Sequence, residues 1–88
     1  MNMDLRPHEA RVNITWRGQN GELIDTVRWD STNHDVIGWV TEAVRTGDVP
    51  GIDPDARADF RDYLVDRFGP TAHRPYNLIQ VRPPTPFG

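Results

Sequence analysis

The chain has 88 residues, ten basic and 13 acidic side chains, a formal net charge of −3 and no cysteine. This length allows one domain with a modest core, because domains of this size bury only about 60–70% of their unfolded surface. The missing cysteines exclude disulfides, thiolate nucleophiles and sulfur-based zinc sites, and the negative charge argues against a general phosphate-binding surface.

Every basic residue is arginine. The absence of lysine is typical of a protein from a GC-rich genome, and the functional alternative is a surface that cannot be acylated or conjugated. No apolar run approaches the ~18 residues that a membrane span needs, and residues 1–10 lack the apolar stretch of a signal peptide. We therefore expect a cytoplasmic protein that has no membrane partner.

The first regular signal is a β-hairpin in residues 11–30. Asn20-Gly21 lies at its centre and suits a two-residue type I′ turn, because both central positions of that turn need a positive φ. Apolar side chains alternate with polar ones on both sides of this turn: Val12, Ile14, Trp16, Val27 and Trp29. We expect these five to share one face of a sheet, with Ile14 and Trp29 in the core.

The length of the turn would set the register of this hairpin. A two-residue turn pairs Val12 with Trp29, whereas a four-residue loop ending at the same glycine pairs Val12 with Val27 and keeps the same faces. Asp25 falls on the apolar face, where a lone carboxylate is costly. We expect it at the open end of the sheet near Trp16, or beside a hydrogen-bond donor.

A helix is expected at about residues 33–46. Apolar residues recur there at spacings of three and four: Val36, Ile37, Val40, Ala43 and Val44. Residues 31–33 offer an N-terminal cap, and Gly47 stands where a helix end favours a positive φ. Trp39 lies off the apolar stripe, so it is either a flank of the core or an exposed contact for a partner.

A second helix is expected between Asp53 and the Gly69-Pro70 pair. Asp53 can cap it, and Pro54 suits the first helical position, where no N–H is needed. The expected apolar stripe follows helical spacing: Ala56, Phe60, Tyr63, Leu64 and Phe68.

The last periodic segment, YNLIQVR at 76–82, is apolar on both faces, as a central strand is. The expected fold is α+β, a small two-layer sandwich with the element order ββααβ. A three-stranded sheet of order 2-1-3 would carry both helices on one face, with the last strand parallel to the first through a right-handed crossover. This domain spans residues 1–82, and 83–88 form a proline-rich tail.

The sequence offers little chemistry. The acids of DPDARAD at 53–59 are spaced like the start of a calcium loop, but Arg57 stands at a ligand position and the required glycine is missing. His8, His34 and His73 have no partner at helical metal-site spacing, and no phosphate loop or nucleophile elbow occurs. We expect no cofactor, no metal and no catalytic residue.

The expected function is that of a non-catalytic protein-binding module, such as an accessory subunit or inhibitor of bacterial or phage origin. Exposed aromatic and arginine side chains dominate interface energies, which makes Trp39 and Arg45 the candidate contact pair. Arg82 and Phe87 are further candidates, because three prolines stiffen the tail around them. Phe87 would dock on its own domain, on a partner or on a second copy of the chain.

Two alternatives use other residues. The predicted hairpin, crossing helix and late parallel strand resemble the topology of β-grasp domains of ubiquitin type, although the second helix departs from that family. The resemblance implies a carrier that is activated at its terminal glycine, Gly88, but the double glycine of the family is absent here. The other alternative is a nucleic-acid binder that uses Arg11, Arg17, Arg28 and the tryptophans.

Overall fold

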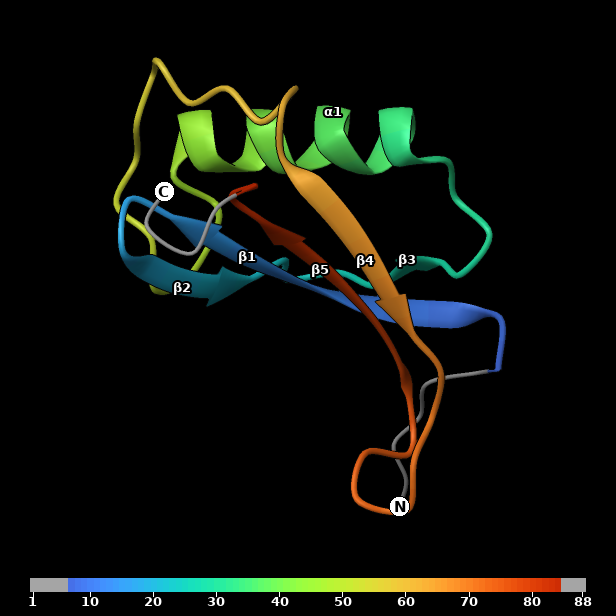
Figure 1. The fold of residues 1–88 in the computed structure, drawn as a ribbon. Coiled ribbons are helices and arrows are strands. Elements are labelled where there is room, and N and C mark those ends of the chain that lie inside the picture. Colours follow the sequence, from blue (N-terminus) through green and yellow to red (C-terminus); the bar gives the residue numbers. More distant parts are fainter. Residues whose placement is uncertain (1–6, 85–88) are drawn as a thin grey trace.

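The computed structural model describes residues 7–84. Its elements in chain order are β1 (Glu9–Trp16), β2 (Gln19–Glu22), β3 (Val27–Arg28), α1 (Asn33–Thr46), β4 (Leu64–Phe68) and β5 (Asn77–Arg82). In this part of the chain a five-stranded mixed sheet carries a single helix on one face (Figure 1). The chain is a small single-domain α+β protein.

β1 lies at the centre of the sheet, whose strand order is β2-β1-β5-β4 with β3 also paired to β1. It runs parallel to β5 from Ala10 opposite Asn77 to Ile14 opposite Val81, and antiparallel to β2 and β3. The expectation that the last strand runs parallel beside the first is therefore confirmed. β4 pairs antiparallel with β5 and forms the outer edge.

The expected turn of the hairpin is wrong. The chain turns at Arg17-Gly18, which have φ values of 52° and 79°, so that Trp16 pairs with Gln19. Both expected registers fail with it. Gly21 instead lies within β2 and faces the core, where an added Cβ would lie 2.5 Å from the carbonyl oxygen of Pro50. Gly21 is therefore needed because Pro50 packs closely against it. The positive φ values of the turn belong to Arg17 and Gly18.

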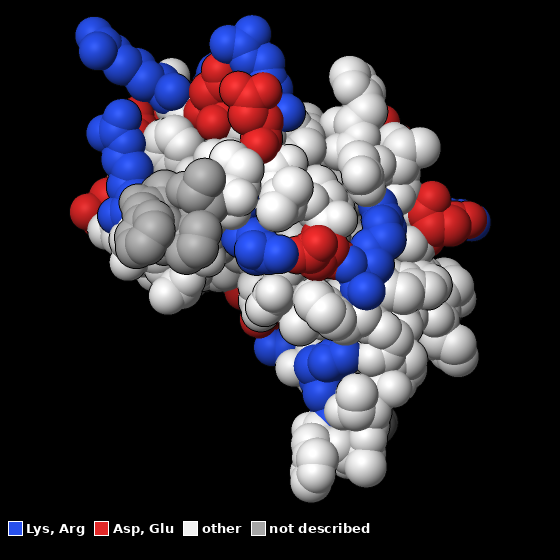
Figure 2. Space-filling view, in the orientation of Figure 1, with Lys and Arg blue, Asp and Glu red and all other residues white. Residues whose placement is uncertain are grey.

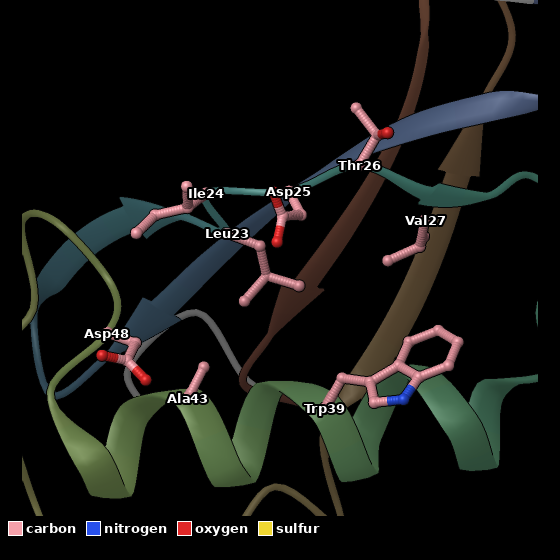
Figure 3. A pocket seen from close by; sticks show the side chains of 8 residues that line it. All are labelled: Leu23, Ile24, Asp25, Thr26, Val27, Trp39, Ala43 and Asp48. Atoms are coloured by element: carbon pink, nitrogen blue, oxygen red, sulfur yellow. The ribbon is translucent and has the colours of Figure 1, made fainter.

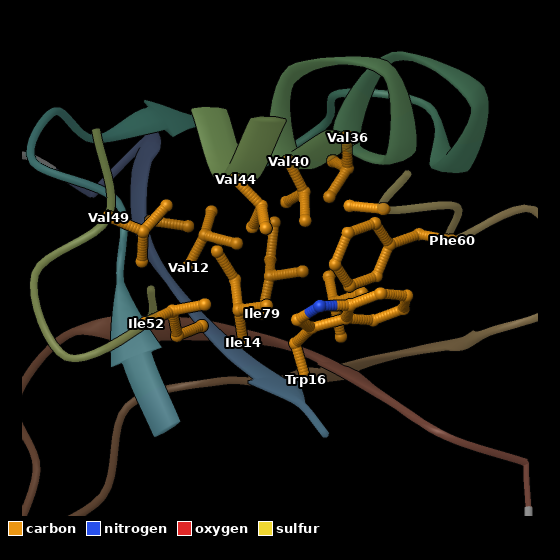
Figure 4. Packing of buried hydrophobic residues seen from close by; sticks show 13 residues of the cluster. Val12, Ile14, Trp16, Val36, Val40, Val44, Val49, Ile52, Phe60 and Ile79 are labelled. Atoms are coloured by element: carbon orange, nitrogen blue, oxygen red, sulfur yellow. The ribbon is translucent and has the colours of Figure 1, made fainter. Parts of the chain in front are cut away.

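The face of the first strand is as expected. Burial alternates strictly along β1, and the side chains that face the helix are Ala10, Val12, Ile14 and Trp16. These pack against Val36, Val40 and Val44 of α1, which are at most 1% exposed (Figure 4). Trp29, expected in the core, is half-buried at its margin.

The first helix is confirmed at Asn33–Thr46. The side chain of Thr32 accepts a hydrogen bond from the backbone N–H of Asp35 at 3.1 Å, which satisfies one of the free donors of the first turn. Gly47 ends the helix with a φ of 80°, as a left-handed C-terminal cap does.

The second helix is wrong, and so is the ββααβ order with its three-stranded sheet. Residues 47–63 cross over without regular secondary structure and lead into β4. The carboxylates of Asp55 and Asp59 accept hydrogen bonds from the backbone N–H groups of Arg57 and Arg61, at 2.9 and 3.1 Å. These local bonds offer the backbone an alternative to the helix.

The crossover segment contributes directly to the core. Its buried side chains are Val49, Ile52, Ala58 and Phe60 (Figure 4). The ring centroid of Phe60 lies 4.8 Å from that of Trp16 and 4.8 Å from that of Tyr63. The indole N–H of Trp16 donates to Asp55 at 3.0 Å, so the buried tryptophan keeps its polar partner.

The edge strand β4 is fixed to the start of the helix by Arg67. Its guanidinium donates to the carbonyl oxygens of Trp29 and Ser31, at 2.9 and 2.6 Å, and to the side-chain oxygen of Asn33 at 2.9 Å. Arg67 thus provides hydrogen-bond donors for two backbone carbonyl groups of the β3–α1 connection. Beyond β4, the loop at 69–76 projects away from the rest of the domain (Figure 1).

Candidate partner-binding groove

A groove lies between α1 and the segment that connects β2 to β3. Its cavity has a volume of about 460 Å³, and we call it the Trp39 groove. The lining residues are Leu23, Ile24, Asp25, Thr26, Val27, Trp39, Ala43 and Asp48 (Figure 3).

An irregular step in the sheet opens this groove. Glu22 pairs with Asn13 and Val27 pairs with Ala10, so four residues, 23–26, stand opposite only two residues of β1. After the backbone N–H of Leu23 donates to Val12 at 3.0 Å, the chain leaves the ladder until β3. Such a bulge bends the strand, and here the bent segment forms one wall of the groove.

The floor of the groove is apolar. Leu23, Val27 and Ala43 are half-buried and pack against the core cluster. Leu23 comes from the segment between β2 and β3 and points toward α1 (Figure 3). Ile24 is 74% exposed, so it extends the apolar surface onto the rim.

Trp39 forms the helical wall, and Ala43 of the floor lies four residues further along the same flank of α1. Trp39 is 45% exposed, and its indole lies toward Val27 (Figure 3). Among residues 7–84 its N–H has no hydrogen-bond acceptor. Of the two interpretations drawn from the sequence, the structure supports the exposed aromatic.

Asp25 and Asp48 are the charged groups that line the groove. Asp25 lies in the bulge, where it is exposed and directed toward α1 (Figure 3). It is not beside Trp16, and it accepts no hydrogen bond from residues 7–84, so both expected placements are wrong. Asp48 follows the helix cap and accepts a hydrogen bond from the Thr46 hydroxyl at 2.9 Å. A carboxylate that breaks the apolar pattern of the hairpin is therefore tolerated because the bulge leaves it in water.

The other predicted contact residues lie elsewhere. Arg45 is on the opposite side of the buried valine stripe from Trp39, and its Nε donates to the carbonyl oxygen of Ala58 at 2.8 Å. Arg45 thus holds the crossover against the helix, and the two residues do not form one surface. Arg82 pairs with Asp66 on the sheet face opposite α1. Phe87 lies outside the described residues.

The arginines of the nucleic-acid alternative are each placed beside an acid. Arg11 pairs with Glu22 at 2.6 Å, Arg17 lies 3.6 Å from Asp55, and Arg28 pairs with Asp30 at 2.9 Å. On the face shown in Figure 2, acidic and basic side chains lie next to one another. Gly88, on which the carrier alternative depends, lies outside the described residues.

Perturbed pKa values occur in the aromatic cluster, away from the groove. The pKa of Asp55 lies below its ordinary value of 3.8 because its carboxylate accepts from the Arg57 N–H and the Trp16 indole and faces Arg17. Burial raises the pKa of Tyr63. Both groups belong to the packing of the crossover.

Within residues 7–84, no three His, Cys, Asp or Glu side chains gather as metal ligands would. No helix in the same range is long and apolar enough to cross a membrane. Comparisons of the chain with protein-family models, with curated proteins and with solved structures gave no match.

Sequence reasoning missed most of the groove. It identified Trp39 but neither Leu23 nor Ile24, although a signal was present. Two consecutive large apolar residues interrupt the alternation of the hairpin, and one of them must then leave the buried face.

Proposed function

We propose that this chain is a non-catalytic protein-binding module whose contact surface is the Trp39 groove. The observation that carries the proposal is the half-exposed Trp39 beside an open apolar groove of about 460 Å³. Tryptophan is among the residues that contribute most to interface energies, and exposed apolar clusters of this kind mark interaction sites.

The shape of the surface favours a macromolecular partner. Ile24 stands on the rim and is 74% exposed, so the apolar area continues beyond the cavity. A small ligand enclosed in the groove would leave this side chain uncovered, whereas a protein segment that crosses the rim would bury it. An apolar side chain of the partner would fill the space between Trp39 and Leu23.

Site-specific cross-linking tests this proposal. A photoreactive benzophenone amino acid replaces Ile24 on the rim, and in a control it replaces Ala56, which is exposed on the crossover. In a lysate of the source cells, we expect a protein adduct from position 24 that is absent from position 56 and is lost when Trp39→Ala is added. The same adducts from both positions, or an adduct that survives Trp39→Ala, would contradict the proposal.

A further inference from the structure

We propose that the partner segment bound in the Trp39 groove carries an arginine or lysine next to the apolar side chain that enters it. The inference rests on the proposed function and adds the chemistry of the partner. It is carried by four carboxylates around the groove that have no cationic partner among residues 7–84.

Two of these carboxylates line the groove itself. Asp25 stands on the wall formed by the bulge, and Asp48 stands where the helix ends, so that they flank the apolar floor (Figure 3). A segment that places an apolar residue on this floor brings its neighbouring side chains within reach of one of the two acids.

The other two carboxylates lie beside Trp39 on α1. Asp35 is four residues before Trp39 and Glu42 is three residues after it, and both spacings make side chains neighbours on a helix surface. Asp35 also complements the positive end of the helix dipole, but Glu42 lies in the middle of the helix, where the dipole does not account for it.

Away from the groove, most of the described acids are paired with an arginine, although Asp53 and Asp62 on the crossover have no arginine nitrogen within 4.0 Å. Five acids elsewhere each lie within 4.0 Å of an arginine nitrogen, and these are Glu22, Asp30, Asp55, Asp59 and Asp66. The side of the domain around the Trp39 groove therefore presents negative charge that the described chain does not neutralise. Such a field attracts a cationic segment and repels an acidic one.

The exposed indole adds to the same preference. The face of a tryptophan attracts guanidinium and ammonium groups, and Trp39 is 45% exposed beside the groove. An apolar residue with a basic neighbour would thus find both an apolar floor and a cation site within one groove.

A peptide selection tests this inference. A displayed library of random twelve-residue peptides is selected on the intact chain and counter-selected on Trp39→Ala. Enriched peptides are synthesised, and their Kd values are measured at low and high salt by titration calorimetry. The variants Asp25→Asn and Asp48→Asn are compared with Asp62→Asn, which removes the same charge from an exposed position on the crossover.

We expect the enriched peptides to place arginine or lysine within a few positions of a large apolar residue. Asp25→Asn and Asp48→Asn should each raise Kd about 2- to 5-fold, added salt should raise it further, and Asp62→Asn should leave it unchanged. Peptides that depend on Trp39 but lack basic residues, or that bind the two groove variants as well as the parent, would overturn the inference alone. A selection without any Trp39-dependent peptide would overturn both the inference and the proposed function.

Discussion

Gly21 and Gly38 both have an ordinary backbone conformation, but they differ in the space that is available for a side chain. An added Cβ at Gly21 would lie 2.5 Å from the Pro50 carbonyl oxygen and 2.7 Å from a methyl carbon of Val49, whereas one at Gly38 would meet nothing within 4 Å. Neither residue has a positive φ, so the effect of an added Cβ depends on the surrounding packing and on whether the glycine lies in a strand or a helix.

We expect Gly21→Ala to destabilise the domain by about 1–3 kcal/mol, because β2 or the loop after α1 must move to make room. Gly38→Ala should stabilise it by about 0.5–1 kcal/mol, because alanine is the better residue inside a helix. Urea unfolding of both variants measures the difference. Equal midpoints would mean that the loop does not pack on β2 as described.

Asp55 links the aromatic cluster to the pH dependence of stability. Its folded-state pKa lies below the ordinary 3.8, chiefly because the Arg57 N–H and the Trp16 indole donate to the carboxylate. A depressed pKa stabilises the fold above the unfolded value, and this contribution is lost as the pH falls through the folded pKa.

The variant Asp55→Asn should therefore unfold at lower urea concentration than the parent at pH 7, and the difference should shrink as the pH falls from about 5 to about 2.5. Asp62→Asn serves as the control, since it removes the same charge from a side chain without a partner among residues 7–84. A difference between Asp55→Asn and the parent that stays constant over this pH range would contradict the assigned role.

The position of the hairpin turn could not be predicted from local residue preferences. Both Arg17-Gly18 and Asn20-Gly21 contain a glycine, and local preference favours the second pair. The chain turns at Arg17-Gly18 because Gly21 is required opposite Pro50, a residue 29 positions away. Local preference does not include that contact.

Among the elements, α1 was predictable and the crossover was not. The helix has its own caps and an apolar stripe at helical spacing, so local information suffices. In residues 53–68 the same kind of spacing is present, but Leu64 and Phe68 point to the open face of the sheet and are 39% and 43% exposed. Instead of a helix, the segment forms hydrogen bonds from backbone N–H groups to the carboxylates of Asp55 and Asp59, and its last residues pair with β5.

Phe60 and Phe68 distinguish the two interpretations of this segment. A helix with the expected stripe would bury both rings, whereas the structure buries Phe60 completely and leaves Phe68 43% exposed. We expect Phe60→Ala to cost about 3–5 kcal/mol and Phe68→Ala no more than about 1 kcal/mol. Similar losses of unfolding free energy for both variants would favour the helix instead.

For the whole molecule, the groove depends on contacts between segments far apart in the chain. Trp39 was recognisable as an aromatic residue off the buried stripe, and its position required only the helix. The opposite wall required the bulge at 23–26, which follows from the register of both hairpin partners on β1. The wrong turn therefore concealed the groove, and the expected pairing of Arg45 with Trp39 fails because the two residues lie on different flanks of α1.

The most direct measurement compares Trp39→Ala with Arg45→Ala for both unfolding and cross-linking from position 24. Trp39→Ala should keep a folded domain and lose the partner adduct, because the indole forms the groove. Arg45→Ala should lower the unfolding free energy by about 1–2 kcal/mol, through loss of the hydrogen bond to Ala58, and retain the adduct. A folded Trp39→Ala that still gives the adduct in full yield, or an equal loss of the adduct in both variants at matched stability, would contradict the assignment of the Trp39 groove as the contact surface.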